Sequence, residues 1–155
     1  MGKLQDLMRV VDILKGAKDI IATRWVKGNY VRDAKGNGKN MGVWLGIPDQ
    51  DESDWGYCGD GALRRKIKNE LHNWNIRESK AESLLYEAQK AIAGRIEARA
   101  PNQISRPNAK IWCFNDLPET TQEIMLEIYD EAIAEQCALV RKKAEEQDGS
   151  PGPAS

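Results

Sequence analysis

Apolar residues recur at steps of three and four over residues 4–23. Leu7, Val11 and Leu14 show the spacing, which places one apolar stripe on one face of a helix. Gly16 interrupts this stripe, at a cost of about 1 kcal/mol relative to alanine. The pattern therefore predicts either one helix with a weak point or two short helices.

Two more helices are predicted in the middle of the chain. Asp60 is expected to cap the first, whose stripe is Leu63, Ile67, Leu71 and Trp74. Ser79 and Glu82 have the spacing of a capping box, which predicts the start of the second. That helix ends before Pro101, and its stripe is Leu85, Ala88, Ile92 and Ile96. Each stripe indicates a helix that packs one face against a core.

A last helix is predicted after Asp116, which is expected to cap it. Pro118 is tolerated in a first turn, and Glu119 would lie near the positive end of the helix dipole. The apolar stripe of this helix is Met125, Ile128, Tyr129, Ala132 and Val140. Residues 149–155 are rich in glycine and proline and can neither continue a helix nor bury surface.

The strand signals are shorter. Residues 25–32 alternate as a half-buried strand does, residues 33–40 supply turn residues, and residues 41–45 read as a second strand. We therefore expect a β-hairpin here, followed by an exposed acidic loop over residues 48–56. The apolar run at residues 111–114 is predicted to be a buried strand.

Together these elements predict an α+β fold. Four or five helices would pack against a small, mainly antiparallel sheet of two to three strands. The length of 155 residues fits one domain, which we place at residues 1–147, with a flexible tail at residues 148–155. Hydrophobic residues make up 41% of the chain and charged residues 30%, a balance typical of globular proteins.

Composition and charge exclude several classes of function. No apolar run approaches the ~20 residues that span a bilayer, and the first residues lack a secretory signal, so a soluble cytoplasmic protein without a membrane partner is expected. A formal net charge of -1 makes nucleic acid an unfavourable main partner. The three cysteines, Cys58, Cys113 and Cys137, have no disulfide or zinc spacing.

Two clusters look like cofactor or metal sites but lack the required residues. Gly36, Gly38 and Gly42 crowd one stretch, but Met41 stands where a dinucleotide loop needs glycine, so a hairpin turn is favoured. The acidic cluster is Asp49, Asp51, Ser53, Asp54 and Asp60. An EF-hand loop beginning at Asp49 would need glycine at position 54 and glutamate at position 60, so a solvated loop is favoured. We expect no cofactor and no resident metal.

Catalytic and binding readings of the polar residues remain open. Cys58 precedes a helix, where a thiol can become a nucleophile, but His72 is the one histidine and lies about three turns away. A packed core cysteine is the favoured reading. The alternative function is a small enzyme that uses Cys58 or a carboxylate such as Asp33, Asp60 or Asp116.

Charged residues segregate along the chain. One basic run is Arg64, Arg65, Lys66 and Lys68, and another is Arg95, Arg99, Arg106 and Lys110. The last helix is acidic, with Glu119, Glu123, Glu127, Asp130 and Glu131. Converging basic faces could bind a phosphate, a nucleotide or an acidic protein, although solvated helix faces are the ordinary reading. The segregation is compatible with a homodimer and with a different protein partner.

Five tryptophans against one phenylalanine is an unusual ratio. Trp44 and Trp112 fall in predicted strands and are expected in the core. Trp55 lies in the polar loop and is the best candidate for an exposed anchor. The functional alternative is an aromatic pocket that stacks a base or another planar ligand, which all five could line: Trp25, Trp44, Trp55, Trp74 and Trp112.

Three segments resemble a family of unknown function found in bacteria, notably actinobacteria, and in their phages. Residues 25–36 are similar to its Trp-x-x-Gly-x-x-x-Arg-Asp-Ala-x-Gly pattern, residues 58–63 to Cys-x-x-Gly-Ala-Leu, and residues 112–116 to a Trp-Asn-Asp-like segment. The resemblance covers residues 7–135. It departs from the family at Cys113 and Phe114, and in a long insertion before Ile111. It implies a phage or mobile-element accessory protein and no known activity.

The function expected from these features is non-enzymatic binding of a host or phage protein, or of a small ligand that could be nucleotide-like. Antagonism of host defence is one such role. The residues predicted to contact the ligand or partner are Arg32, Asp33, Trp55, Arg64, Arg65, Asn115 and Asp116. Arg32, Asp33, Asn115 and Asp116 have a competing structural reading as turn braces and helix caps.

Overall fold

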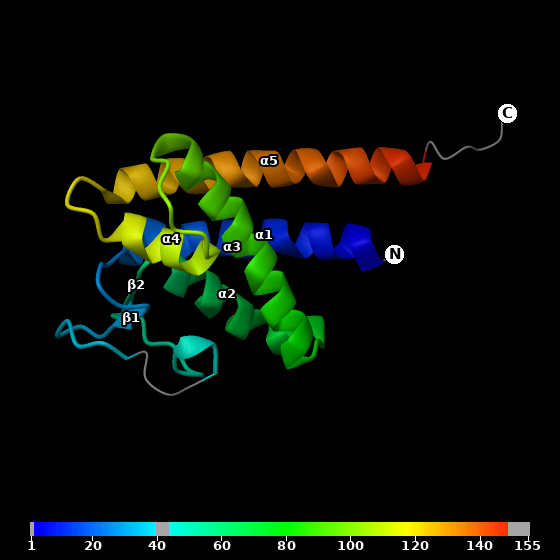
Figure 1. The fold of residues 1–155 in the computed structure, drawn as a ribbon. Coiled ribbons are helices and arrows are strands. Elements are labelled where there is room, and N and C mark those ends of the chain that lie inside the picture. The colour runs from blue at the N-terminus through cyan, green and yellow to red at the C-terminus, as the bar shows by residue number, and fades with distance from the viewer. Residues whose placement is uncertain (1, 40–43, 149–155) are drawn as a thin grey trace, which may run out of the picture.

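The computed structural model describes residues 2–39 and 44–148. Two long helices, α1 (Gly2–Arg24) and α5 (Gln122–Asp148), run antiparallel and side by side (Figure 1). Their apolar stripes meet in the core, where Leu14 and Ile128 are fully buried. The stripe predicted for residues 4–23 therefore forms one unbroken helix.

Gly16 is a packing position rather than a break in α1. A Cβ atom at Gly16 would lie 2.3 Å from Cδ of Lys66, which belongs to α2 (Gly59–Trp74). The aliphatic part of Lys66 therefore crosses α1 where the backbone is bare. The loss of helix propensity at Gly16 is offset by this close approach of two helices.

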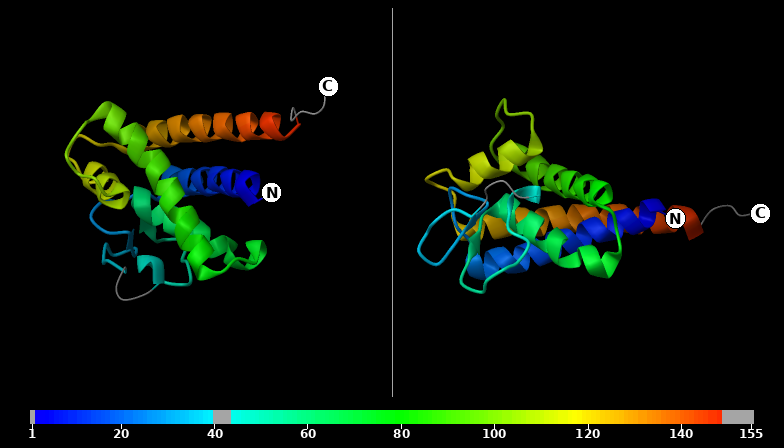
Figure 2. Two further views of the ribbon diagram at one scale, coloured as in Figure 1. Left: turned by 45° about the vertical axis from the view of Figure 1, so that its right-hand side comes forward. Right: turned by 90° about the horizontal axis from the view of Figure 1, so that it is seen from below.

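The other long helix is α3 (Glu78–Arg99), which crosses the α1–α2 pair obliquely (Figure 2). Its predicted stripe is buried, with Ile92 and Ile96 fully inaccessible. The predicted capping box is wrong, because α3 begins at Glu78 and its N-cap residue is Arg77, which makes no side-chain cap bond. The cap predicted for α2 is also wrong: Asp60 lies inside the first turn, and Cys58 is the N-cap.

The sheet has two short antiparallel strands, β1 (Val31–Arg32) and β2 (Gly56–Tyr57). Within the described part of the chain, β1 pairs with β2 at the end of the acidic loop, and Trp44 and Leu45 of the predicted second strand are not in a strand. Residues 41–43 lie outside the described part of the chain, and the next residues form a 3-10 turn, η1 (Trp44–Gly46). The predicted turn itself is present, since Gly36 N donates to Asp33 O at 2.9 Å. The predicted class is confirmed: residues 2–39 and 44–148 form an α+β fold with five helices, where four or five were expected, and a small antiparallel sheet of two strands.

The strand predicted at residues 111–114 is wrong, because these residues belong to a helix, α4 (Pro107–Asn115). Pro107 occupies its first turn, where a missing N–H has no cost and the fixed φ favours a helix. Ile111 and Asn115, one turn apart, face the core, which leaves Trp112 on the outer side. The packing of α4 onto α3 supplies the burial that the short helix needs.

Asp116 ends α4 and does not begin α5, so its predicted role as cap of the last helix is wrong. Thr121 takes that role: its Oγ1 accepts a hydrogen bond from Ile124 N at 3.2 Å, near the start of α5. The predicted boundary at residue 147 falls one position before the end of α5 at Asp148, and residues 149–155 lie outside the described part. Over the described ranges, every helix is too short or too polar to cross a bilayer.

Candidate functional site

Asn115 joins three segments at the end of the bundle that carries the sheet. Its Oδ1 accepts hydrogen bonds from Trp25 Nε1 at 2.7 Å and from Gly59 N at 2.9 Å. Its Nδ2 donates to Val26 O at 3.0 Å and to Asp116 Oδ1 at 3.1 Å. A buried amide that makes two donor and two acceptor bonds has used its capacity. Asn115 therefore positions its neighbours and offers no group to a ligand.

Asp116 extends this network to the segment after α1. Its Oδ1 also accepts a hydrogen bond from Gly28 N at 2.9 Å. Gly28 has φ +93°, and a Cβ atom there would lie 2.3 Å from Nη2 of Arg32. Arg32 Nε donates to Lys27 O at 2.6 Å. The Trp-x-x-Gly-x-x-x-Arg spacing thus builds one local turn, which needs glycine for its conformation and its space.

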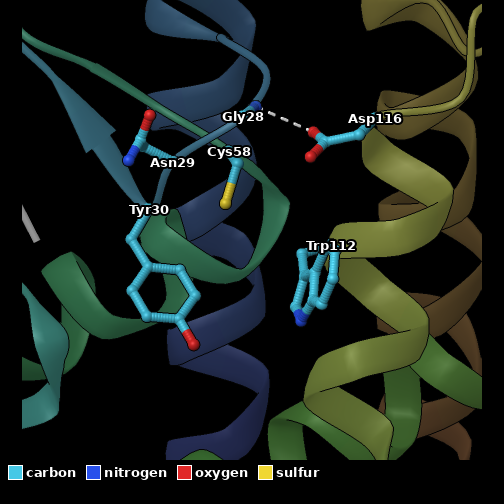
Figure 3. A pocket seen from close by; sticks show the side chains of 6 residues that line it. All are labelled: Gly28, Asn29, Tyr30, Cys58, Trp112 and Asp116. Carbon is cyan, nitrogen blue, oxygen red and sulfur yellow. Dashed lines mark hydrogen bonds between the residues drawn. The ribbon is translucent and has the colours of Figure 1, made fainter. Parts of the chain in front are cut away.

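A cavity of about 260 Å³ opens beside this turn, and we name it the α4 cavity (Figure 3). It is lined by Gly28, Asn29, Tyr30, Cys58, Trp112 and Asp116. Trp112 is 44% exposed and stands across the space from Tyr30, and Cys58 lies between them (Figure 3). The second carboxylate oxygen of Asp116 is turned toward the space between Cys58 and Trp112 (Figure 3).

Cys58 lines the α4 cavity without being a poised nucleophile. Its Sγ accepts a hydrogen bond from Gly61 N at 3.3 Å, which caps α2, and the residue is only 2% exposed. Burial, together with the nearby carboxylates of Asp60 and Asp116, raises the pKa of the Cys58 thiol to about 12. The group is therefore a neutral thiol at physiological pH, whereas catalytic cysteines have lowered pKa values. His72 lies in the last turn of α2, far along the helix from Cys58.

A buried ion pair between Arg64 and Asp60 supports Tyr30, which lines one side of the α4 cavity. Asp60 is fully buried and accepts hydrogen bonds from Arg64 Nε at 3.0 Å and from Gln89 Nε2 at 2.8 Å. Burial raises the pKa of Asp60, while Arg64 acts in the opposite direction. The Arg64 guanidinium lies 4.0 Å from the Tyr30 ring centroid and donates to the Tyr30 hydroxyl at 3.2 Å. Arg64 thus fixes the tyrosine ring from behind.

A family of proteins of unknown function, DUF6197, matches residues 6–135, which is most of the chain. The chain belongs to this family. The match covers nearly the same residues as the predicted resemblance, and it includes every residue that lines the α4 cavity. Neither the curated proteins nor the solved structures contain a match.

Arg65, a predicted binding residue of this DUF6197 protein, is fully buried. Its guanidinium donates to three backbone carbonyls of the loop before β2, at 2.7 Å to Pro48 O, 3.1 Å to Asp49 O and 3.0 Å to Gln50 O. Its Nε donates to the Tyr57 hydroxyl at 2.9 Å. Arg65 therefore anchors a loop from inside and is not accessible from solvent.

Three other predicted residues, Arg32, Asp33 and Trp55, line a separate, wider groove of about 570 Å³. Asp33 braces the turn that follows β1, since its Oδ1 accepts from Lys35 N at 3.0 Å and from Asn37 N at 2.9 Å. These bonds lower the pKa of Asp33. Trp55 is half-buried against the core. The seven predicted residues therefore do not converge on one site.

The charged helix faces of the DUF6197 chain pair with each other. Arg95 contacts Glu131 and Glu135 of α5, at 3.3 Å and 2.7 Å, and Arg99 contacts Glu131 at 2.9 Å and Glu127 at 3.0 Å. Lys110 of α4 pairs with Glu97 of α3. Part of the charge segregation along the sequence is thus satisfied by ion pairs between α3 and α5.

The acidic loop is likewise tied to basic residues. Asp51 accepts hydrogen bonds from Arg24 and from the Tyr57 hydroxyl, and Asp49 pairs with Lys68 at 2.9 Å. Throughout residues 2–39 and 44–148, no three His, Cys, Asp or Glu side chains are grouped as metal ligands would be.

Tyr30 is not among the residues predicted for a site, and Trp112 is named there only in the alternative in which all five tryptophans line a pocket. Trp112 was expected in the core because a strand was expected there, and the prediction is wrong because α4 turns this position outward. A sequence signal did exist: Pro107 at a helix start, with Ile111 and Asn115 four residues apart, places Trp112 beside the buried stripe. The other four tryptophans pack against the core and are Trp25, Trp44, Trp55 and Trp74.

Proposed function

We propose that this protein is a non-enzymatic binding protein that holds a small ligand in the α4 cavity. The observation that carries the proposal is the placement of Trp112, a large aromatic side chain that is 44% exposed and faces Tyr30 across an open space. A cavity with aromatic walls and one directed polar group is the usual form of a small-molecule site. Asp116 supplies the polar group here.

The groups that an enzyme would use are held in structural bonds. A nucleophile needs a base within hydrogen-bond reach, and Cys58 instead caps α2 as a neutral thiol. Asp60 is paired with Arg64, and Asp33 holds a turn. These contacts favour binding over the alternative of a small enzyme that works through Cys58 or a carboxylate.

The biological role that we propose is that of a phage or mobile-element accessory protein. Its support is the resemblance of the sequence to proteins of bacteria and their phages. Such a protein would act in the cytoplasm of the bacterial host, and removal of a small ligand is one way to antagonise host defence. The α4 cavity, and not a broad charged face, would then be the surface responsible for this role.

The proposal is tested by purifying the protein from its native host and recording mass spectra under non-denaturing conditions. We expect a bound small molecule with the wild-type protein and its loss from Trp112→Ala. Tyr86→Ala is the matched control, because Tyr86 is also a half-exposed aromatic residue (50%) on a helix, but lies outside the α4 cavity. Retention of the molecule by Trp112→Ala, or its chemical turnover in a manner lost in Cys58→Ser, would overturn the proposal.

A further inference from the structure

We infer that the α4 cavity binds a neutral, planar heterocycle of nucleobase size that carries an amino group. This inference rests on the proposed function and names the class of ligand. It follows from the size of the cavity, from its walls, from the charges around it and from the hydrogen bonds that Asp116 already makes.

The size of the cavity limits the ligand to one ring system. Sites for drug-sized molecules measure roughly 300–1,000 Å³. The α4 cavity, at about 260 Å³, lies just below that range. A single heterocycle therefore fills it, and a sugar or phosphate attached to the ring would remain outside its mouth.

The walls favour a flat ligand. Trp112 and Tyr30 stand on opposite sides of the space, on α4 and on the segment that leads into β1 (Figure 3). Tyr30 is held by Arg64, and the buried Asn115 anchors the helix that carries Trp112. A pre-formed gap between two aromatic side chains stabilises a stacked planar group at little cost in ordering.

The charges around the cavity disfavour an anionic ligand. An anion would meet the carboxylate of Asp116, whose second oxygen is turned toward the space (Figure 3). The Arg64 guanidinium, which is paired with Asp60, already lies on the Tyr30 ring, so a ligand cation on that ring would gain less than on a bare one. A neutral ring with a hydrogen-bond donor suits both features.

Asp116 selects the substituent on the ring. Its Oδ1 is taken by Gly28 N and Asn115 Nδ2, whereas no hydrogen bond to Oδ2 is made within the described residues. An ionised carboxylate oxygen accepts hydrogen bonds and cannot donate them. A ring amino group satisfies Oδ2, and a ring carbonyl in the same place would oppose it.

The test is calorimetric titration with nucleosides that differ in this one group. Adenosine and cytidine carry the amino group, and inosine and uridine carry a carbonyl instead. We expect wild-type protein to bind adenosine or cytidine at least about tenfold more tightly than its carbonyl counterpart. Trp112→Ala should weaken this binding about 5- to 150-fold through loss of stacking, and Tyr86→Ala should leave it unchanged.

The variant Asp116→Asn tests whether Asp116 sets the preference for an amino group without changing the fold. Asparagine keeps an oxygen for Gly28 N and Asn115 Nδ2 but presents a donor where Oδ2 was. We expect this variant to keep the circular dichroism spectrum of the wild type and to lose or invert the preference for the amino compound.

Equal binding of amino and carbonyl nucleosides, or no binding of either amino nucleoside, would overturn the inference. A co-purified ligand of another class whose binding still depends on Trp112 would support the proposed function and contradict only the inference that the ligand is an amino heterocycle.

Discussion

At the scale of single residues, Asn115 at the end of α4 holds three segments of the fold together through its side-chain hydrogen bonds. It satisfies an indole N–H, a backbone N–H at the start of α2 and a carbonyl after α1. We predict that Asn115→Ala lowers the free energy of unfolding by about 3 kcal/mol, because buried donors and an acceptor are left without partners. Urea denaturation measures this change. A loss below about 1 kcal/mol would show that water replaces the hydrogen bonds of the amide.

Two glycines in helices should respond to alanine in opposite directions. A Cβ atom at Gly61 would lie 1.9 Å from Tyr30 O, a backbone atom, whereas nothing lies within 4 Å of a Cβ atom at Gly94. We predict that Gly61→Ala destabilises the fold by about 3 kcal/mol through overpacking. Gly94→Ala should stabilise it by about 1 kcal/mol through helix propensity. Thermal and urea unfolding of both variants provide the comparison, and the same sign for both would contradict the packing at Tyr30.

Asp51 makes part of the stability depend on pH. Its desolvation raises the pKa, but hydrogen bonds from Arg24 and Tyr57 lower it more, so the folded-state pKa lies below the ordinary value. Its contribution is therefore present above the unfolded-state pKa of about 3.9 and is lost as the pH falls through the lower folded-state value. We predict that Asp51→Asn costs about 1 kcal/mol at pH 7, discounted for partial exposure.

The difference in free energy of unfolding between wild type and Asp51→Asn should narrow as the pH drops below about 4, where the Asp51 carboxylate of the unfolded chain begins to gain its proton. Urea unfolding of both proteins at several pH values measures this difference in free energy of unfolding. A gap that stays constant into acid would mean that the Arg24 and Tyr57 contacts do not depend on the charge of Asp51.

At the scale of elements, long helices were predictable and short elements were not. The stripes of α1, α2, α3 and α5 extend over enough turns for the period of 3.6 residues to be unambiguous. The run at residues 111–114 spans about one turn, so its pattern fits a strand as well as a helix. Packing against α3 stabilises the helical conformation of these residues, and this long-range contact cannot be read from the local sequence pattern.

The sheet shows the same limit. The two strands of the sheet have two residues each, and their pairing joins β1 to residues about 25 positions later (Val31 to Tyr57). Hairpin patterns report on neighbours in sequence, and here the partner of β1 lies beyond the intervening loop. The carbonyl bonds of Arg65 hold that loop in place, and a basic run in the sequence gives no sign of this role.

At the scale of the whole molecule, the candidate site was only half predictable. Asn115 and Asp116 are predicted because they match the family resemblance and follow an expected strand, where binding sites often lie; Asp116 lines the α4 cavity and Asn115 lies directly behind it. Arg32, Asp33 and Trp55 line a separate groove, and Arg64 and Arg65 support the interior. Residues from three distant parts of the chain meet only because Asn115 ties α4 to the segments on either side of it in space.

The central claim, that the α4 cavity is where a ligand binds, is tested most directly by nuclear magnetic resonance of the indole N–H groups. The chain has five tryptophans, and single Trp→Phe variants assign their signals. We predict that the native-host ligand, or adenosine or cytidine as a probe, shifts the Trp112 signal and leaves that of Trp74 in place. A Trp112 signal that stays unchanged while that of Trp55, in the wider groove, moves would contradict the account.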